Sequence, residues 1–179
     1  HALGNDYLVL EEGPPLTPAL VRALCDRHRG MGSDGILEPM PAEQADSALI
    51  IWNPDGSMAE KSGNGLRIFA RWLFEKGHRQ KLSVALPGEV VHCEVFADRI
   101  AVEMGRCHFE PSEVPVKASK PVLDAPWQVG PYCLNVVAVG VGNPHCVVFR
   151  DEDLDQLPWR EWGRLLESDS RFPNRTNVQ

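Results

Sequence analysis

A polar, glycine-containing loop precedes the most apolar helical segment of the chain. It runs from Asn53 to Gly65 (NPDGSMAEKSGNG) and ends in Ser-Gly-Asn-Gly, directly before a helix predicted over residues 66–76. The first N–H groups of a helix lack intrahelical partners, and with the helix dipole they favour an anion such as a carboxylate. Glycines let a ligand approach the backbone closely. The same N–H groups would stabilise the negative charge that develops when a proton leaves an α-carbon.

Asparagine side chains recur in the polar segments. Asn5, Asn53, Asn64 and Asn143 carry neutral donors and acceptors that could orient the ammonium and carboxylate groups of an amino acid. A simpler interpretation of the loop is a tight strand-to-helix connection with Ser62 as an ordinary N-cap. The motif is too short to decide between the two.

Proton transfer at this loop would require a group of suitable acidity. The hydroxyl of a serine such as Ser62 does not ionise usefully without a neighbouring general base. Lys61 and His145 are conceivable bases, although a solvated lysine and an orienting or structural histidine are the simpler interpretations.

The cysteines do not form a recognisable cluster. There are five, an odd number, at positions 25, 93, 107, 133 and 146, and none forms a CxxC pair. We therefore expect neither a metal site nor a disulfide framework, and free thiols in a reducing cytoplasm. Cys146 follows a Gly-Asn-Pro-His turn, but a packed strand cysteine is its simplest interpretation.

Composition narrows the class of partner. The net charge of −7 and the sequence pI near 5.3, without a basic block, argue against nucleic-acid binding. No apolar run approaches the ~18 residues of a membrane span, and the amino end does not resemble a signal peptide. We expect a soluble cytoplasmic protein whose partner is a small polar molecule. The oligomeric state is left open, a homodimer included.

The elements that must position these residues alternate between strands and helices. A helix is predicted from Thr17-Pro18, an N-cap followed by proline, to Gly30. The helix over residues 66–76 is apolar nearly all round and should be buried. A third helix begins near Pro158 and carries Trp159, Trp162, Leu165 and Leu166 on one face. Strands are predicted over residues 7–11, 47–52, 90–96, 99–104, 132–141 and 146–149.

An internal similarity suggests two copies of one fold. ALGNDYLVLE near the start resembles GVGNPHCVVFR from residue 140, and Asn5 and Asn143 are 138 residues apart. Pro-rich sequence over residues 110–127 is the best candidate for a crossover, with the boundary between Arg106 and Pro115. We expect a first lobe over residues 1–107 and a partial second lobe over residues 108–179. At the repeat spacing, the counterpart of Ser62 would lie past Gln179.

Several ordered segments resemble the diaminopimelate epimerase family. NPDGSMAEKSGNGLRIFARWL is similar to the active-site loop and central helix of the family, and HALGNDYLVLE to its amino-terminal strand. DRHRGMGSDGIL, AVGVGNPHCVVF and RFPNRTNVQ resemble three further family segments. Together they span essentially the whole chain, which makes the resemblance highly specific.

The resemblance implies a fold and a chemistry. It implies a mixed α+β fold of two similar lobes, each a curled, mostly antiparallel sheet around a central helix, with the second lobe incomplete here. Family members place one cysteine from each half on opposite faces of the α-carbon, as thiolate base and thiol acid, and need neither pyridoxal phosphate nor metal. The resemblance implies the interconversion of L,L- and meso-diaminopimelate, on the route to lysine and peptidoglycan.

By position, six residues match substrate contacts of the family: Asn5, Asn53, Gly63, Asn64, Asn143 and Asn177. Two positions depart from the family pattern. A glutamine that contacts substrate in some members is Gly35 here, and Ser62 stands where the family has its first catalytic cysteine. A cysteine thiol titrates near ~8.5 and lower at a helix N-terminus, whereas a serine hydroxyl does not.

Three explanations for Ser62 remain open: an engineered Cys-to-Ser change, a natural variant in which Ser62 relays or donates a proton, or loss of epimerisation with binding retained. The neighbouring Lys61 and Leu66 also differ from the commonest family pattern, which favours natural divergence. Three functions also remain open: the epimerase itself, a related racemase or one-base dehydratase, and a catalytically silent amino-acid-binding protein.

Overall fold

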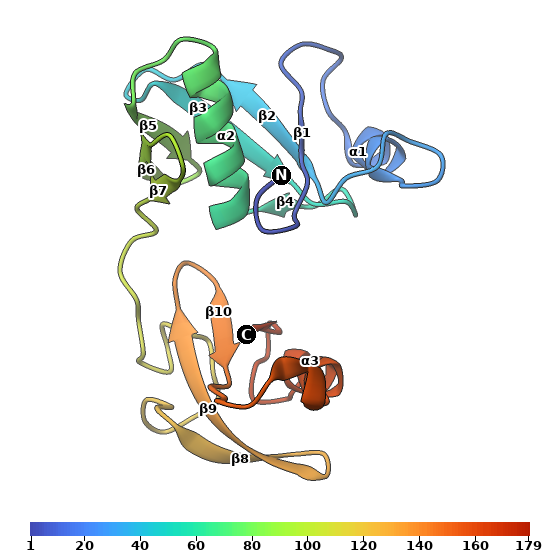
Figure 1. The fold of residues 1–179 in the computed structure, drawn as a ribbon, viewed down its shortest axis with the longest axis vertical. Coiled ribbons are helices and arrows are strands. Elements are labelled where there is room, and N and C mark those ends of the chain that lie inside the picture. Colours follow the sequence, from blue (N-terminus) through green and yellow to red (C-terminus); the bar gives the residue numbers. More distant parts are fainter. The chain divides into compact units, whose positions relative to one another are not determined.

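The computed structural model describes residues 1–179, which fold into two compact units, His1–Met104 and Gly105–Gln179 (Figure 1). Each unit has its own sheet and its own apolar core. None of the helices combines the length and the apolar character that crossing a membrane requires.

The first unit is a seven-stranded sheet with two helices. The strand order is β1-β2-β3-β5-β6-β7, with β4 paired to β3, and all pairings are antiparallel except β1 with β2 and β3 with β5. The strands are β1 (Leu8–Val9), β2 (Ile36–Met40), β3 (Ser47–Trp52), β4 (Met58–Ala59), β5 (Lys81–Leu86), β6 (Glu89–Val95) and β7 (Ile100–Val102), and the helices are α1 (Pro18–Cys25) and α2 (Gly63–Glu75).

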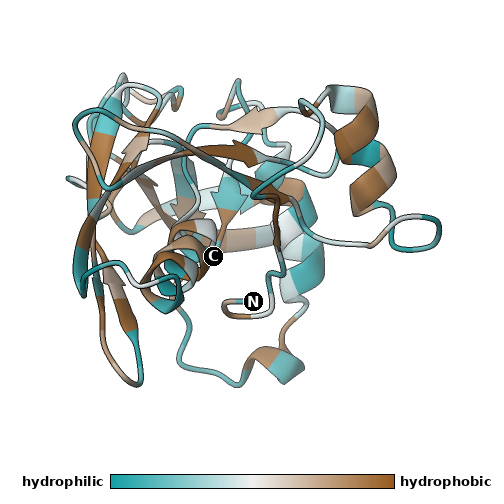
Figure 2. Cartoon of the chain, turned by 90° about the horizontal axis from the view of Figure 1, so that it is seen from above, coloured by the Kyte–Doolittle hydropathy of each residue, from teal (hydrophilic) through white to brown (hydrophobic).

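Strands β2 and β3 are covered on both faces. Successive strand residues point to opposite faces, so the cross-strand pair Ile36 and Trp52 packs with α1, whereas Leu37 and Ile51 pack with α2. This double burial explains why residues 48–52 (ALIIW) are apolar throughout. Helix α1 needs only one apolar side, and its ribbon carries both brown and teal segments in Figure 2.

Helix α2 has well-defined ends. Ser62 is its N-cap, and its C-terminus closes with Gly77 at a φ of +96°. The Gly77 N–H bonds to the Phe74 carbonyl and the His78 N–H to the Leu73 carbonyl, the pair that defines a Schellman motif. The predicted end of this helix near residue 76 is therefore confirmed. Buried Leu66, Phe69, Ala70 and Leu73 anchor the helix on the sheet.

The second unit is a four-stranded sheet in the order β11-β10-β9-β8, with one α-helix. The hairpin of β8 and β9 and the pair β9–β10 are antiparallel, and β10–β11 is parallel. Trp162 and Leu166 of α3 enter the core. The elements are β8 (Ala125–Val129), β9 (Tyr132–Gly140), β10 (Pro144–Val147), the short 3-10 helix η1 (Leu154–Gln156), α3 (Trp159–Glu167) and β11 (Asn177–Val178).

The two units share a strand–helix–strand motif. In the first, β1 and β2 flank α1 and pair in parallel, with Leu8 opposite Ile36. In the second, β10 and β11 flank α3 and pair in parallel, with Cys146 opposite Val178. Leu8 and Cys146 each lie three residues after the asparagine of the repeat predicted from the sequence.

Two element predictions were wrong. Helix α1 ends at Cys25 rather than Gly30, because the Asp26 carboxylate accepts the N–H groups of His28 (2.8 Å) and Arg29 (2.9 Å) in a turn. The Pro-rich stretch is not a crossover between the units: buried Val114, Val116 and Val122 belong to the core of the second unit, and β8 begins at the end of the stretch. Five strands were not predicted: β2, β4, β5, β8 and β11.

Candidate functional site

Ser62 lies at the start of α2 with its hydroxyl engaged by two neighbours. Its Oγ accepts a hydrogen bond from the Gly65 N–H (3.0 Å), and it lies 3.2 Å from the Tyr7 hydroxyl oxygen in a second hydrogen bond. Ser62 is therefore the N-cap that the simpler interpretation of the loop requires. The contact with Tyr7 joins the helix start to the residues just before β1.

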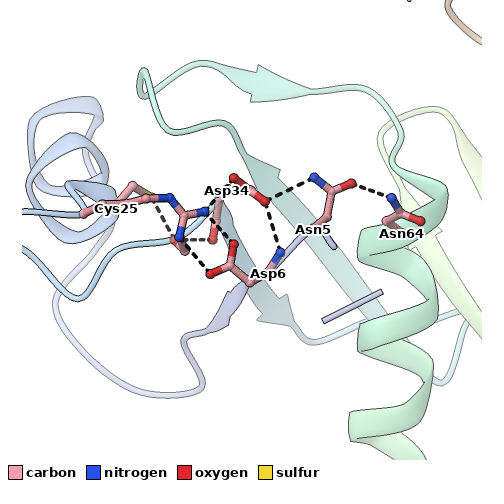
Figure 3. A network of polar contacts seen from close by, with 8 residues as sticks. Asn5, Asp6, Cys25, Asp34 and Asn64 are labelled. Carbon is pink, nitrogen blue, oxygen red and sulfur yellow. Dashed lines mark hydrogen bonds and ion pairs between the residues drawn. The ribbon is translucent and has the colours of Figure 1, made fainter. Parts of the chain in front are cut away.

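Asn5 and Asn64 are in direct contact beside Ser62. The Asn64 Nδ2 donates to the Asn5 Oδ1, and the Asn5 Nδ2 donates to the Asp34 carboxylate at 3.2 Å. The Asn64 Oδ1 in turn accepts from the Arg67 guanidinium. Figure 3 shows this chain of contacts running from Asp34 through Asn5 to Asn64. Two predicted site residues far apart in the sequence thus lie together.

Asp34 and Arg67, at the two ends of this series of hydrogen bonds, fix the orientation of both amides. A carboxylate can only accept, so the amide nitrogen of Asn5 must face Asp34 and its oxygen must face Asn64. A guanidinium can only donate, so the oxygen of Asn64 must face Arg67. Each amide then retains one N–H that is not used inside the chain. These two N–H groups add to the donors at the helix start.

Arg27 binds Asp34, the first residue of this series of hydrogen bonds. Its guanidinium bonds to Asp34 (2.7 Å) and to both oxygens of Asp6 (2.6 and 3.1 Å), next to Asn5. The hydrogen bond from Arg27 lowers the pKa of Asp6 from 3.8 to about 2. Asp34 and Asp6 thus share one cation, and this ion pair holds in place the Asp34 carboxylate that binds Asn5.

Glycines allow the helix start to sit close to the sheet. A Cβ on Gly65 would lie 3.2 Å from the Leu37 Cδ2 and 3.2 Å from the Ser62 Oγ. The N–H groups of Gly63 and Asn64, the first two positions of α2, have no partner within the helix. Together these features make the helix start a site for an anion.

Asn53 and Lys61 are held by other contacts. The Asn53 side chain donates to the Ser57 hydroxyl (3.0 Å) within the turn that leads to β4. The Lys61 ammonium pairs with Glu89 (2.7 Å) and donates to the Met104 carbonyl (3.0 Å), with only 5% of its side chain exposed. No hydrogen bond joins either of them to Ser62, and the suggestion that Lys61 is its base gains no support.

The second unit brings together its own predicted residues. His145 and Asn177 are opposite each other in the β10–β11 register, and the Asn177 Nδ2 donates to the Pro144 carbonyl (3.2 Å). The His145 Nε2 lies 2.8 Å from the Asn143 Oδ1, and burial lowers the pKa of the imidazole. Asn143, His145 and Asn177 therefore form a second polar cluster, at the start of β10.

Gly35 has no room for a side chain. A Cβ there would lie 2.3 Å from the Trp52 carbonyl oxygen and 2.8 Å from the Tyr7 Cε1, and its φ of +155° disfavours other residues. The Tyr7 ring thus borders the space into which a side chain at position 35 would project.

The cysteines do not replace the missing thiol. Cys25, Cys93 and Cys146 are buried, and Cys107 and Cys133 are exposed. Burial raises the pKa of the Cys146 thiol to about 12 and that of Cys93 to about 11, so neither is a useful thiolate. No group of three or more His, Cys, Asp or Glu side chains could hold a metal ion.

Sequence reasoning missed Tyr7, Asp34 and Arg27. Asp34 contacts Asn5 across 29 residues of sequence and Tyr7 contacts Ser62 across 55, so no local pattern announces either contact. The available signal was weaker: Tyr7 and Asp34 lie inside two of the segments that resemble the family.

Comparisons with known proteins agree with the sequence resemblance. Residues 1–110 match the family model described as diaminopimelate epimerase. The chain is 41% identical to diaminopimelate epimerase 2 of Nostoc sp., covering 100% of this chain and 66% of that protein. It is 36% identical to the diaminopimelate epimerase of Pelotomaculum thermopropionicum, covering 100% and 68%. The chain thus spans roughly two thirds of the length of these curated relatives.

Solved structures show the fold. A hydroxyproline epimerase from Agrobacterium vitis with bound trans-4-hydroxy-L-proline is similar with a TM-score of 0.64 and 18% identity, over 99% of this chain and 62% of that chain. A probable proline racemase from Agrobacterium radiobacter K84 is similar with a TM-score of 0.61 and 17% identity, over 99% and 63%. The predicted mixed α+β class, with a partial second lobe, is confirmed.

Proposed function

This chain belongs to the diaminopimelate epimerase family, and we propose that the whole protein is an isomerase that interconverts L,L- and meso-diaminopimelate. The reaction removes a proton from an α-carbon and returns one to its opposite face. The proposal includes a small amino acid as substrate, no organic cofactor or metal, and a cytoplasmic location. It leaves a homodimer open.

The observation that carries the proposal is the polar arrangement at the start of α2. Free N–H groups of Gly63 and Asn64 converge with the amides of Asn5 and Asn64, whose orientation is fixed by Asp34 and Arg67. Such donors suit the α-carboxylate of an amino acid, and they stabilise the charge that develops on it when the α-proton is removed.

We propose further substrate contacts for three asparagines. Asn53 follows β3 in the first unit, and Asn143 and Asn177 lie near the start of β10 and on β11 in the second. Their neutral amides can bind the ammonium and carboxylate at the other end of diaminopimelate. The partnership of Asn143 with His145 and of Asn177 with Pro144 holds both amides in place.

Ser62 is proposed as the catalytic group on one face of the α-carbon. Its position at the helix N-terminus favours negative charge by up to about 2 kcal/mol, which shifts the acidity of the hydroxyl only slightly. That shift is far too small to make an aliphatic hydroxyl a base at neutral pH. In one direction Ser62 donates its proton while a base on the opposite face, where the family has its second cysteine, removes the α-proton. In the other direction Ser62 removes the α-proton, and a neighbouring group must take the Ser62 proton.

The experiment uses the full-length protein with L,L- and, separately, meso-diaminopimelate in D2O. The α-proton signal and the stereochemistry are followed by NMR, with Ser62→Ala as the comparison. We expect deuterium incorporation with inversion from both isomers, and loss of inversion in Ser62→Ala.

Two other outcomes contradict the proposal. Exchange without inversion would indicate one surviving base, as in a one-base reaction, and Ser62→Cys should then restore inversion. No exchange from either isomer, in the natural protein and in Ser62→Cys alike, would exclude diaminopimelate as substrate and leave amino-acid binding alone.

A further inference from the structure

The Tyr7 hydroxyl is the only side-chain group that hydrogen-bonds to Ser62. We propose that Tyr7 and Ser62 act as a two-hydroxyl proton donor, in which Ser62 delivers its proton to the α-carbon and Tyr7 replaces it. This inference rests on the proposed function and concerns the identity of the acid at the same site.

When the Ser62 oxygen accepts both of its hydrogen bonds, its own proton is not used in either of them. A serine oxygen has two lone pairs and one proton. The Gly65 N–H occupies one lone pair at 3.0 Å, and the Tyr7 O–H can occupy the other at 3.2 Å. The Ser62 proton then points away from both donors. A hydroxyl that accepts two hydrogen bonds is also a better proton donor, because neighbouring hydrogen bonds polarise one another.

No other acidic group contacts Ser62. The Lys61 ammonium is held by Glu89 and the Met104 carbonyl, and the buried Cys93 and Cys146 belong to the cores of their sheets. A phenol ionises near ~10 in free tyrosine, against ~8.5 for a thiol, so a phenol is the nearest substitute among common side chains. The tyrosine thus supplies acidity that the serine lacks.

The step balances without a cofactor. A base on the opposite face takes the α-proton, which breaks the C–H bond and leaves the electron pair on the α-carbon. That pair forms a new C–H bond with the Ser62 proton, the Ser62 O–H bond breaks, and the Tyr7 proton moves to the Ser62 oxygen. The resulting phenolate takes a proton from solvent water. Tyr7 is only partly buried, so water can reach it.

The reverse direction requires the same groups to accept a proton. The same transfers run backwards: the Tyr7 phenolate takes the Ser62 proton while the Ser62 oxygen takes the α-proton.

The test is a double-mutant cycle on the full-length protein, in which Tyr7→Phe is combined with Ser62→Cys. Deuterium incorporation with inversion from each isomer of diaminopimelate is measured, with kcat and KM separated. Tyr132→Phe is the matched control, because Tyr132 is the other tyrosine and its hydroxyl bonds to Glu161 on α3 of the second unit.

We expect Tyr7→Phe to lower kcat by about a hundredfold or more when residue 62 is serine, with KM little changed. When residue 62 is cysteine, the thiol is its own acid, and the loss should shrink to at most about tenfold, the cost of a neutral hydrogen bond. Tyr132→Phe should leave kcat unchanged. Retention of the tyrosine ring keeps its packing against the core of the first unit.

Equal losses from Tyr7→Phe in both backgrounds would overturn the inference, since they would indicate a structural role. If Ser62→Cys with Tyr7 intact shows no exchange with diaminopimelate, the proposed function itself fails. Activity of Ser62→Cys with equal Tyr7→Phe losses refutes only the role of Tyr7.

Discussion

At the scale of single residues, Asp34 determines which way the Asn5 amide faces. It is the only acceptor of the Asn5 amide nitrogen, so the Asn5 oxygen is turned toward the Asn64 amide nitrogen, while Arg67 fixes the Asn64 oxygen. A neutral amide at position 34 could donate as well as accept, so Asn5 could reverse and present its nitrogen to the Asn64 nitrogen, which would break their hydrogen bond.

We therefore expect Asp34→Asn to raise KM for diaminopimelate about five- to thirtyfold, the equivalent of roughly 1–2 kcal/mol, with a smaller effect on kcat. Steady-state kinetics of the full-length protein measure this. Asp46→Asn is the matched control, because Asp46 accepts hydrogen bonds from Ser83 and Arg79 elsewhere in the unit. A KM that rises equally in both variants would refute the orienting role of Asp34.

A second residue-scale prediction concerns Cys146. Burial raises the pKa of its thiol to about 12, and its side chain is fully buried, whereas Cys107 and Cys133 are exposed. An alkylating reagent at pH 8 should modify Cys107 and Cys133 in the folded protein and leave Cys146 unmodified until denaturant is added. Peptide mass spectrometry measures the three rates. Labelling of Cys146 as fast as Cys133 would show that β10 opens readily.

At the scale of elements, the sequence predicted α2, β3 and all of β9 and failed at β2 and β5. Continuous apolar sequence identified β3 because helices cover both of its faces. Strand β2 contains Pro39, which usually argues against a strand interior, but Pro39 lies past the part of β2 that pairs with β1. Strand β5 does alternate, with Leu82, Val84 and Leu86 buried, and could have been found.

The ion pair between Arg27, which follows α1, and Asp6, which precedes β1, should depend on pH. Arg27 lowers the pKa of Asp6 from 3.8 to about 2, so the charged form is favoured in the folded state. Its stabilising effect is present above pH 3.8 and is lost as the pH falls toward 2. Urea unfolding of the protein and of Asp6→Asn should differ by a constant amount above pH 5, and the difference should shrink below pH 4. A difference that is constant down to pH 2 would contradict the shift.

At the scale of the whole molecule, the repeat and the family were both predictable, but the contacts that complete the site were not. Ordered matches along the chain identify the family whatever the details of packing. The contacts of Tyr7 with Ser62 and of Asp34 with Asn5 depend instead on how the segment before β1 lies against α2 and β2. Distances of this kind follow from tertiary packing, which one sequence does not encode in any local pattern.

The two cores share no residue, so damage to one should be local. Phe69 is fully buried in the first unit and Leu134 is almost fully buried in the second. Phe69→Ala should destabilise the first unit by about 3–5 kcal/mol and Leu134→Ala the second by about 2–5 kcal/mol. Hydrogen exchange measured by mass spectrometry should show faster exchange in α2, β3 and β5 for the first variant and in β8 and β9 for the second. Equal acceleration throughout the chain would indicate a single cooperative unit.

The crowding at Gly35 restricts which substitutions this position can accept. A backbone carbonyl, that of Trp52, and the Tyr7 ring stand where a side chain at position 35 would begin. A Cβ placed there would lie 2.3 Å from that carbonyl oxygen. Introducing a side chain requires earlier changes that move the end of β3 and the tyrosine, and each of those would have to be tolerated by itself. A descendant of this protein is therefore far more able to recover a cysteine at position 62 than a glutamine at position 35.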